Sequence, residues 1–228
     1  MQFTKQKGFT LVEIAIVLVI VGLLIGGVLK GQEMITNAKL KRIESDNAGI
    51  AAAMFSYQDR YLQLPGDDGD AGSRFDAYIL GATPIGTDAN GSGDGTIGAG
   101  DDWDDVVLLA TWAPGVVGDE TSKFFAHLRA ASLIPGGGAT DVSRLNNAYG
   151  GLIAVQNGAL DIPATVTIFS QIEGAVARIL ETRLDDGDIA TGRMQSEEIG
   201  AITGMDAGAP TTAAGYVESD RYNVAFRL

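Results

Sequence analysis

Residues 88–101 carry oxygen-bearing side chains at the spacing of a twelve-residue calcium loop. Counted from Asn90, oxygen ligands fall at positions 1, 3, 5 and 7, with glycine at position 6, an apolar residue at position 8 and a carboxylate at position 12. The ligand residues of this pattern are Asn90, Ser92, Asp94, Thr96 and Asp101, and Asp88 offers an alternative. Because Ca²⁺ prefers oxygen ligands, one interpretation of the segment is a calcium site.

The match to a calcium loop is incomplete, so a second interpretation stays open. Positions 1 and 3 are neutral, position 12 is Asp rather than Glu, and no flanking helix is evident. Residues 81–105 are also close to a low-complexity Gly/Asp stretch, which is typical of a flexible, solvated acidic loop.

Two further groups of residues could do chemistry, but neither indicates an enzyme. The segment Asp101–Asp105 holds four carboxylates around Trp103, yet the acid pair of a glycosidase usually comes from separate elements around a cleft. Any Ser-His-Asp site would need His127, the only histidine. That histidine lies beside Phe124, Phe125 and Leu128, which favours a structural role.

The composition excludes several classes of protein. A formal net charge of −13 and a sequence pI near 4.3 repel nucleic acid, so we expect no nucleic-acid binding by this chain. The absence of cysteine excludes disulfides and thiol chemistry, and with one histidine it excludes Cys/His zinc sites. Glycine, at 31 of 228 residues, is about twice as frequent as usual, which indicates a loop-rich region.

A single acidic residue interrupts an apolar stretch near the N-terminus. Phe9–Leu29 has one charged residue, Glu13, and as a helix it would span about 30 Å, enough to cross a bilayer. Lys5 and Lys7 precede it, so the N-terminus should stay cytoplasmic. Because a carboxylate in an apolar helix is costly unless paired, Glu13 is a candidate functional residue.

Three common explanations of such an N-terminus fit poorly. A secretory signal needs a small-residue cleavage site, and the stretch ends in Val28-Leu29-Lys30-Gly31 instead. A lipoprotein signal needs a cysteine. A plain membrane anchor explains neither Glu13 nor the glycine before Phe9.

The segment Lys5-Gln6-Lys7-Gly8-Phe9-Thr10-Leu11-Val12-Glu13 resembles the processing site of type IV pilins and of type II secretion pseudopilins. The resemblance implies that a prepilin peptidase cleaves between Gly8 and Phe9 and N-methylates Phe9. It also implies that Glu13 serves in assembly. Phe9 and Glu13 are four residues apart on one helical face, so the new amine could pair with Glu13 of a neighbouring subunit.

The resemblance further implies a homo-oligomeric filament and an assembly platform in the inner membrane. The precursor would lie in the inner membrane, and the product would be an extracellular pilus or, alternatively, a periplasmic pseudopilus. Two features depart from many pilins: Lys30, flanked by glycines, stands where a proline is common, and the usual cysteine pair is absent.

The hydrophobic pattern predicts an α+β protein with a long N-terminal helix. The helix should continue past the membrane segment as an amphipathic half and stop before Pro65-Gly66. Its mainly apolar stripe, at spacings of three and four, is Ile43, Asn47, Ile50, Met54, Tyr57 and Tyr61. The predicted parts are a leader (1–8), a long helix (9–64, with 9–29 transmembrane) and an acidic globular head (65–228).

Within the small, loop-rich head, we expect a short antiparallel sheet and two helices. The helices are predicted at 121–133 and 171–184, the latter with Ile172, Val176, Ile179 and Leu180 inward. Strands are predicted at 152–155, 165–169 and 222–228.

Three functions remain compatible with the sequence. A subunit of a surface pilus is favoured modestly, because the head is larger than in typical major pseudopilins. A pseudopilin of a type II secretion system, or a minor pilin, is the alternative. A membrane-anchored binding or enzymatic head is the third.

Overall fold

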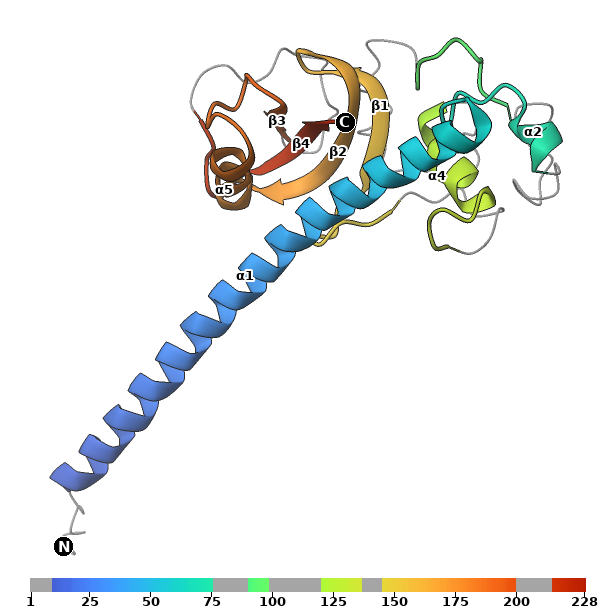
Figure 1. Ribbon diagram of the computed structural model, residues 1–228. Coiled ribbons are helices and arrows are strands. Elements are labelled where there is room, and N and C mark those ends of the chain that lie inside the picture. The colour runs from blue at the N-terminus through green and yellow to red at the C-terminus, as the bar shows by residue number, and fades with distance from the viewer. Residues whose placement is uncertain (1–9, 76–89, 99–119, 137–144, 200–214) are drawn as a thin grey trace, which may run out of the picture. The chain divides into compact units, whose positions relative to one another are not determined.

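The computed structural model describes residues 10–75, 90–98, 120–136, 145–199 and 215–228. The chain divides into two compact units, residues 1–41 and 42–228, and the division falls inside the first helix. The unit of residues 42–228 is an α+β fold with a four-stranded antiparallel sheet, as predicted (Figure 1).

The helix α1 runs from Leu11 to Tyr61. It continues through Gly26, Gly27 and Gly31, although glycine lowers helix stability by about 1 kcal/mol relative to alanine. It ends at Leu62, whose φ of 56° takes the chain out of the helix just before Pro65-Gly66. In the second unit its apolar stripe is buried, as predicted, at Ile43, Ile50, Met54 and Tyr57.

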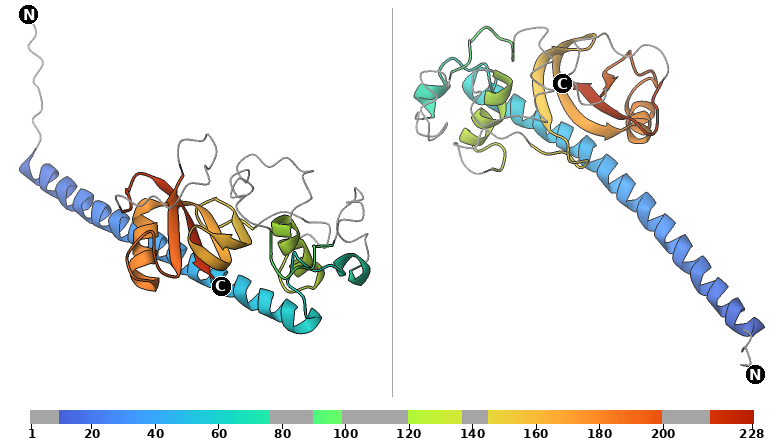
Figure 2. Two further views of the ribbon diagram at one scale, coloured as in Figure 1. Left: turned by 90° about the horizontal axis from the view of Figure 1, so that it is seen from above. Right: turned by 180° about the vertical axis from the view of Figure 1, so that it is seen from behind.

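The sheet has the strand order β1-β2-β4-β3, and Figure 2 shows it from two further sides. The strands are β1 (Ile153–Ala159), β2 (Ile162–Glu173), β3 (Met194–Glu198) and β4 (Arg221–Arg227). All three pairings are antiparallel, and both faces are buried: Ala154, Ile168 and Ala225 lie across neighbouring strands on one face, and Ile153, Phe169 and Val224 on the other.

Three helices complete the described part of the second unit: α2 (Ala71–Arg74), α4 (Glu120–Ala130) and α5 (Gly174–Leu184). The helix α4 lies against β1, and α5 lies against β2, β3 and β4. Phe124, Phe125 and Leu128 of α4 are fully buried.

The boundary between β2 and α5 differs from the prediction. Residues 171–173 belong to β2 rather than to a helix, because Ile172 and Glu173 pair with Tyr222 and Arg221 of β4. A bulge precedes this pairing, at Gln171, whose φ is 63°. The predicted inward position of Ile179 is also wrong, since that side chain is 38% exposed.

Candidate functional site

The start of α1 is stabilised by a reciprocal pair of hydrogen bonds between Thr10 and Glu13. The amide and the hydroxyl of Thr10 both donate to Oε2 of Glu13 at 2.9 Å, and the amide of Glu13 donates to the Thr10 hydroxyl at 3.3 Å. This arrangement is a capping box, in which each residue satisfies a helix amide that would otherwise lack a partner. The sequence signal for this capping box is Thr-x-x-Glu before an apolar run.

The predicted cleavage site itself, Gly8 and Phe9, lies outside the described residues. Glu13 is exposed, and so is the apolar surface that follows it. Large apolar side chains with at least 43% exposure cover α1 from its first turn to the end of the predicted membrane segment: Leu11, Val12, Ile14, Ile16, Val17, Leu18, Val19, Ile20, Val21, Leu23, Leu24, Ile25, Val28 and Leu29.

An apolar surface of this extent is unfavourable in water, so it must be covered by lipid or by protein. By length and composition, α1 is the one helix of the described residues that could cross a membrane. An exposed ion pair follows the apolar stretch: Nζ of Lys30 lies 2.7 Å from Oε2 of Glu33. Charge therefore returns to the helix where the predicted membrane segment ends.

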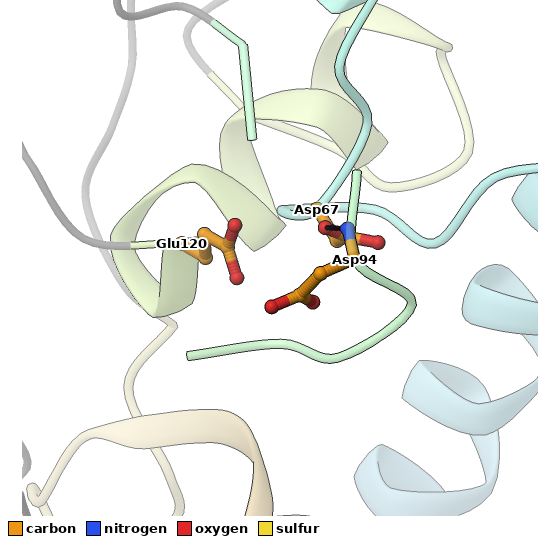
Figure 3. A group of neighbouring side chains, drawn as sticks. All are labelled: Asp67, Asp94 and Glu120. Atoms are coloured by element: carbon orange, nitrogen blue, oxygen red, sulfur yellow. Dashed lines mark hydrogen bonds between the residues drawn. The ribbon is translucent and has the colours of Figure 1, made fainter. Parts of the chain in front are cut away.

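The second candidate site, in residues 42–228, gathers three carboxylates. Oxygen atoms of Asp67, Asp94 and Glu120 lie within 4.8 Å of one another. Figure 3 shows the side chains of Asp94 and Glu120 pointing toward each other, with Asp67 behind the backbone of Asp94. Asp94 is one of the predicted calcium ligands, whereas Asp67 and Glu120 lie outside the predicted loop.

Asp67 and Glu120 hold the backbone of residues 92–98. Asp67, which is 1% exposed, accepts hydrogen bonds from the amides of Asp94 (3.0 Å) and Gly95 (2.8 Å). Glu120 accepts from the amides of Ser92 (2.6 Å) and Gly98 (2.8 Å). Two carboxylates from outside the loop thus satisfy four of its amides, which is a way to order a loop without a disulfide.

The other predicted ligands have their own partners. Oδ1 of Asn90 accepts from the amide of Gly72 at 2.7 Å, and the Ser92 hydroxyl donates to Asp67 at 3.2 Å. Oδ1 of Asp94 accepts from the amide and the hydroxyl of Thr96, and these bonds lower the pKa of Asp94.

The predicted apolar position 8, Ile97, is fully buried. Asp88 and Asp101 lie outside the described residues. Calcium binding by the segment 88–101 therefore stays a prediction.

His127 is a structural histidine. It is fully buried, its Nδ1 accepts the amide hydrogen of Gly66 at 2.9 Å, and its ring stacks on Tyr57 with centroids 6.2 Å apart. Since Nδ1 accepts a backbone hydrogen bond, the neutral ring carries its proton on Nε2.

Comparison with known proteins bears on the N-terminal segment. No curated protein and no solved structure gave a significant match to the chain. A family model does match, over residues 3–29, a stretch that contains Gly8, Phe9 and Glu13. At its N-terminus the chain thus carries the prokaryotic N-terminal methylation motif, which is the hallmark of type IV pilins and pseudopilins.

Proposed function

We propose that this protein is a structural subunit of a type IV pilus, made as a membrane-anchored precursor and polymerised through its N-terminal helix. The observation that carries the proposal is that the methylation motif of residues 3–29 contains the bilayer-length apolar surface of α1. Before assembly, lipid would cover this surface. In the filament, the same surface of neighbouring subunits would cover it.

The processing steps assign roles to three residues. A prepilin peptidase of the inner membrane cleaves between Gly8 and Phe9 and methylates the new amine of Phe9. Glu13 then supplies the negative charge that pairs with this amine on a neighbouring subunit. In an apolar bundle such a pair neutralises two charges that would each be costly alone, so it would set the stagger between subunits.

The capping box would orient the Glu13 carboxylate before assembly. In the precursor, Thr10 already satisfies one oxygen of Glu13, so the isolated helix holds this carboxylate near its N-terminus, where the helix dipole favours negative charge. An approaching Phe9 amine therefore meets a carboxylate that is already oriented, which lowers the entropy lost on assembly.

The alternative within the same family is a pseudopilin of a type II secretion system, or a minor pilin. The N-terminal motif serves all of these proteins, so it favours none of them. The two kinds of filament differ in location: a pilus is extracellular, and a pseudopilus is short and periplasmic.

The first test of the proposal is the intact mass of the protein in filaments sheared from the cell surface. An abundant species that begins at methylated Phe9 is expected. The same species confined to membrane and periplasm would favour the pseudopilin. A chain that still carries residues 1–8 would contradict the filament function altogether.

A second test separates assembly from anchoring. Glu13→Gln keeps the side chain's shape and removes its charge, so we expect normal insertion and cleavage but at least a tenfold loss of sheared filaments. The matched control is Glu33→Gln, which removes a glutamate of the same helix from an exposed pair of small energetic value. Wild-type filament yield from Glu13→Gln would contradict the assigned role.

A further inference from the structure

A second group of carboxylates lies at the C-terminal end of α5, away from the predicted calcium loop. Oxygen atoms of Glu181, Asp185 and Asp186 lie within 4.8 Å of one another. Glu181 is in the last turn of the helix, and the other two follow its end. The C-terminus of a helix carries partial negative charge, so three carboxylates there repel both the helix end and one another.

Glu181 is the member of this group whose environment most needs explanation. Its side chain is fully buried (0% exposed), and its Oε1 has no hydrogen-bond partner among the described residues. Its Oε2 accepts a hydrogen bond from the hydroxyl of Tyr216 at 3.0 Å. A buried, unpartnered carboxylate oxygen costs several kcal/mol if the group is charged.

The surrounding charges increase this cost. Burial raises the pKa of Glu181 to about 8, and the negative charges of Asp185, Asp186 and Asp188 add to the rise. The basic side chain of the same helical turn, Arg183, lies 3.2 Å from Glu44 and so compensates a different carboxylate.

The turn after α5 is ordered around the two aspartates. Oδ2 of Asp185 accepts the amides of Arg193 and Met194, the latter at 2.6 Å. Asp186 accepts from the amide of Asp188 at 2.9 Å and from the hydroxyl of Thr191 at 2.8 Å. Residues 185–194 thus form a closed turn whose acidic side chains are held in place before any ligand arrives.

Close packing in the turn points to the same preformed geometry. Gly192 has a φ of 87°, and a Cβ at this position would collide with the carboxylate of Asp185. The amides of Arg193 and Met194 both donate to Oδ2 of Asp185, and a carboxylate oxygen of Asp185 lies within 4.8 Å of one of Glu181.

We propose that Glu181, Asp185 and Asp186 bind a divalent cation, and that the cation is Ca²⁺. The unpartnered Oε1 of Glu181 would become a ligand, together with one carboxylate oxygen each of Asp185 and Asp186, and the cation would offset the negative helix end. The donors are oxygens only, which suits Ca²⁺ and Mg²⁺ rather than the softer metals. Ca²⁺ is favoured because it accepts irregular geometry, whereas Mg²⁺ requires near-ideal octahedral coordination.

The site would join several parts of the second unit. Through Tyr216, whose hydroxyl also lies 2.8 Å from the hydroxyl of Ser196, it connects α5 to β3 and to the segment before β4. A cation there would stabilise the C-terminal part of the sheet in a chain that contains no cysteine.

The cluster of Asp67, Asp94 and Glu120 differs from that of Glu181, Asp185 and Asp186 in its buried carboxylate. Its one buried carboxylate, Asp67, has both oxygens engaged by loop amides, and no unpartnered buried oxygen occurs there among the described residues. The two clusters therefore differ in the property on which the proposal rests, and variants of each can be compared in one experiment.

The test uses the full-length protein in detergent micelles, stripped with EDTA and then dialysed against CaCl2 or MgCl2. Bound metal is counted by mass spectrometry, and Tm is measured by fluorescence. We expect wild type to bind calcium with a rise in Tm of several degrees, and magnesium to bind at least tenfold more weakly.

Three variants locate the site. Glu181→Gln and Asp186→Asn should each bind one calcium fewer than wild type and lose the corresponding rise in Tm, whereas Asp94→Asn should keep it. Asp186 is exposed, so its variant tests the site even if Glu181→Gln does not fold.

The proposal would be overturned if calcium did not change the Tm of the wild type, or if the variants of Glu181 and Asp186 bound calcium as the wild type does. An equal response to MgCl2 would overturn the choice of Ca²⁺. All readouts come from unassembled protein, so none of these outcomes bears on the filament.

Discussion

At the scale of single residues, Glu13 has a partner before assembly and needs another after it. In the uncleaved chain its carboxylate accepts both donors of Thr10. In the proposed filament it faces the Phe9 amine of a neighbour. Both states satisfy a charge that an apolar environment would otherwise penalise, so Glu13 tolerates lipid before polymerisation and stabilises the polymer afterwards.

The capping box can be tested by removing only the hydroxyl of Thr10. Thr10→Val should destabilise the first turn of α1 by about 1 kcal/mol, because the amide of Glu13 loses its acceptor. The measurement is amide hydrogen exchange of residues 11–14 in micelles, with faster exchange expected. Thr10→Ser keeps the hydroxyl and should exchange as wild type does; equal protection in Thr10→Val would show that the cap is unimportant.

A second residue-scale prediction concerns the pKa of Asp94. Hydrogen bonds from the hydroxyl and amide of Thr96 lower this pKa below its ordinary 3.8. A lowered folded-state pKa contributes stability that is present above the unfolded-state pKa and is lost as the pH falls through the folded value.

Thr96→Val should therefore move the pKa of Asp94 back toward 3.8 and shrink the loss of stability on acidification. Carboxyl carbon NMR titration in the presence of chelator measures the pKa directly. Thr96→Ser, which retains a hydroxyl, is the control. An unchanged pKa in the valine variant would contradict the role of the Thr96 hydroxyl and leave the amide of residue 96 and the side chain of Ser92 to lower the pKa.

At the scale of elements, carboxylates order the loop of residues 92–98. Asp67 follows the end of α1, and Glu120 begins α4, so the loop is attached to two elements that are themselves packed in the core. Gly91 makes this attachment possible, because a Cβ there would collide with the backbone of Asp67. The loop is thereby ordered at both ends.

Removing the side chain of Asp67 should lower the stability of the folded protein. Asp67→Ala removes the acceptor of the Asp94 and Gly95 amides, at about 1 kcal/mol for each part-buried hydrogen bond, so a fall in Tm of roughly 5 °C is expected. The control is Asp70→Ala, three residues along, whose side chain is exposed and makes no capping bond. Equal Tm values for the two variants would contradict the structural role of Asp67.

At the scale of the whole molecule, the two units differ in how they meet the solvent. The first presents a continuous apolar surface along α1, whereas the second buries its own core of aromatic and aliphatic side chains in and around the sheet. Such a division suits a subunit that is held in lipid or in a polymer by one part and exposes an acidic surface with the other.

The second unit should consequently fold without the first. We expect residues 42–228 to be monomeric in buffer without detergent and to melt cooperatively, while the full chain needs detergent, because among the described residues they contain every buried hydrophobic side chain except Leu40. Size-exclusion chromatography and circular dichroism provide the measurements. An aggregated or non-cooperative 42–228 fragment would show that the first 41 residues contribute to that core.

Features of this protein that depend on local pattern can be predicted from its amino-acid sequence. The methylation motif, the apolar stretch and the long helix can be derived because each rests on residues within a few turns of one another. The buried stripe of α1 follows from its spacing for the same reason, since neighbours at three and four residues share a helical face. The capping box of Thr10 and Glu13 is also local, so it can be predicted from the sequence.

Contacts between residues that are far apart in the sequence could not be predicted, because they depend on packing. Asp67 and Asp94 are 27 residues apart and Glu181 and Tyr216 are 35 apart, so no local pattern relates them. The strand β3, Met-Gln-Ser-Glu-Glu, is too polar to be predicted and forms because it pairs with the edge of β4. Residues 171–173 are a strand rather than a helix for the same reason: pairing with β4 outweighs their local preference. The burial of Glu181, and with it the proposed cation site, is likewise a consequence of packing.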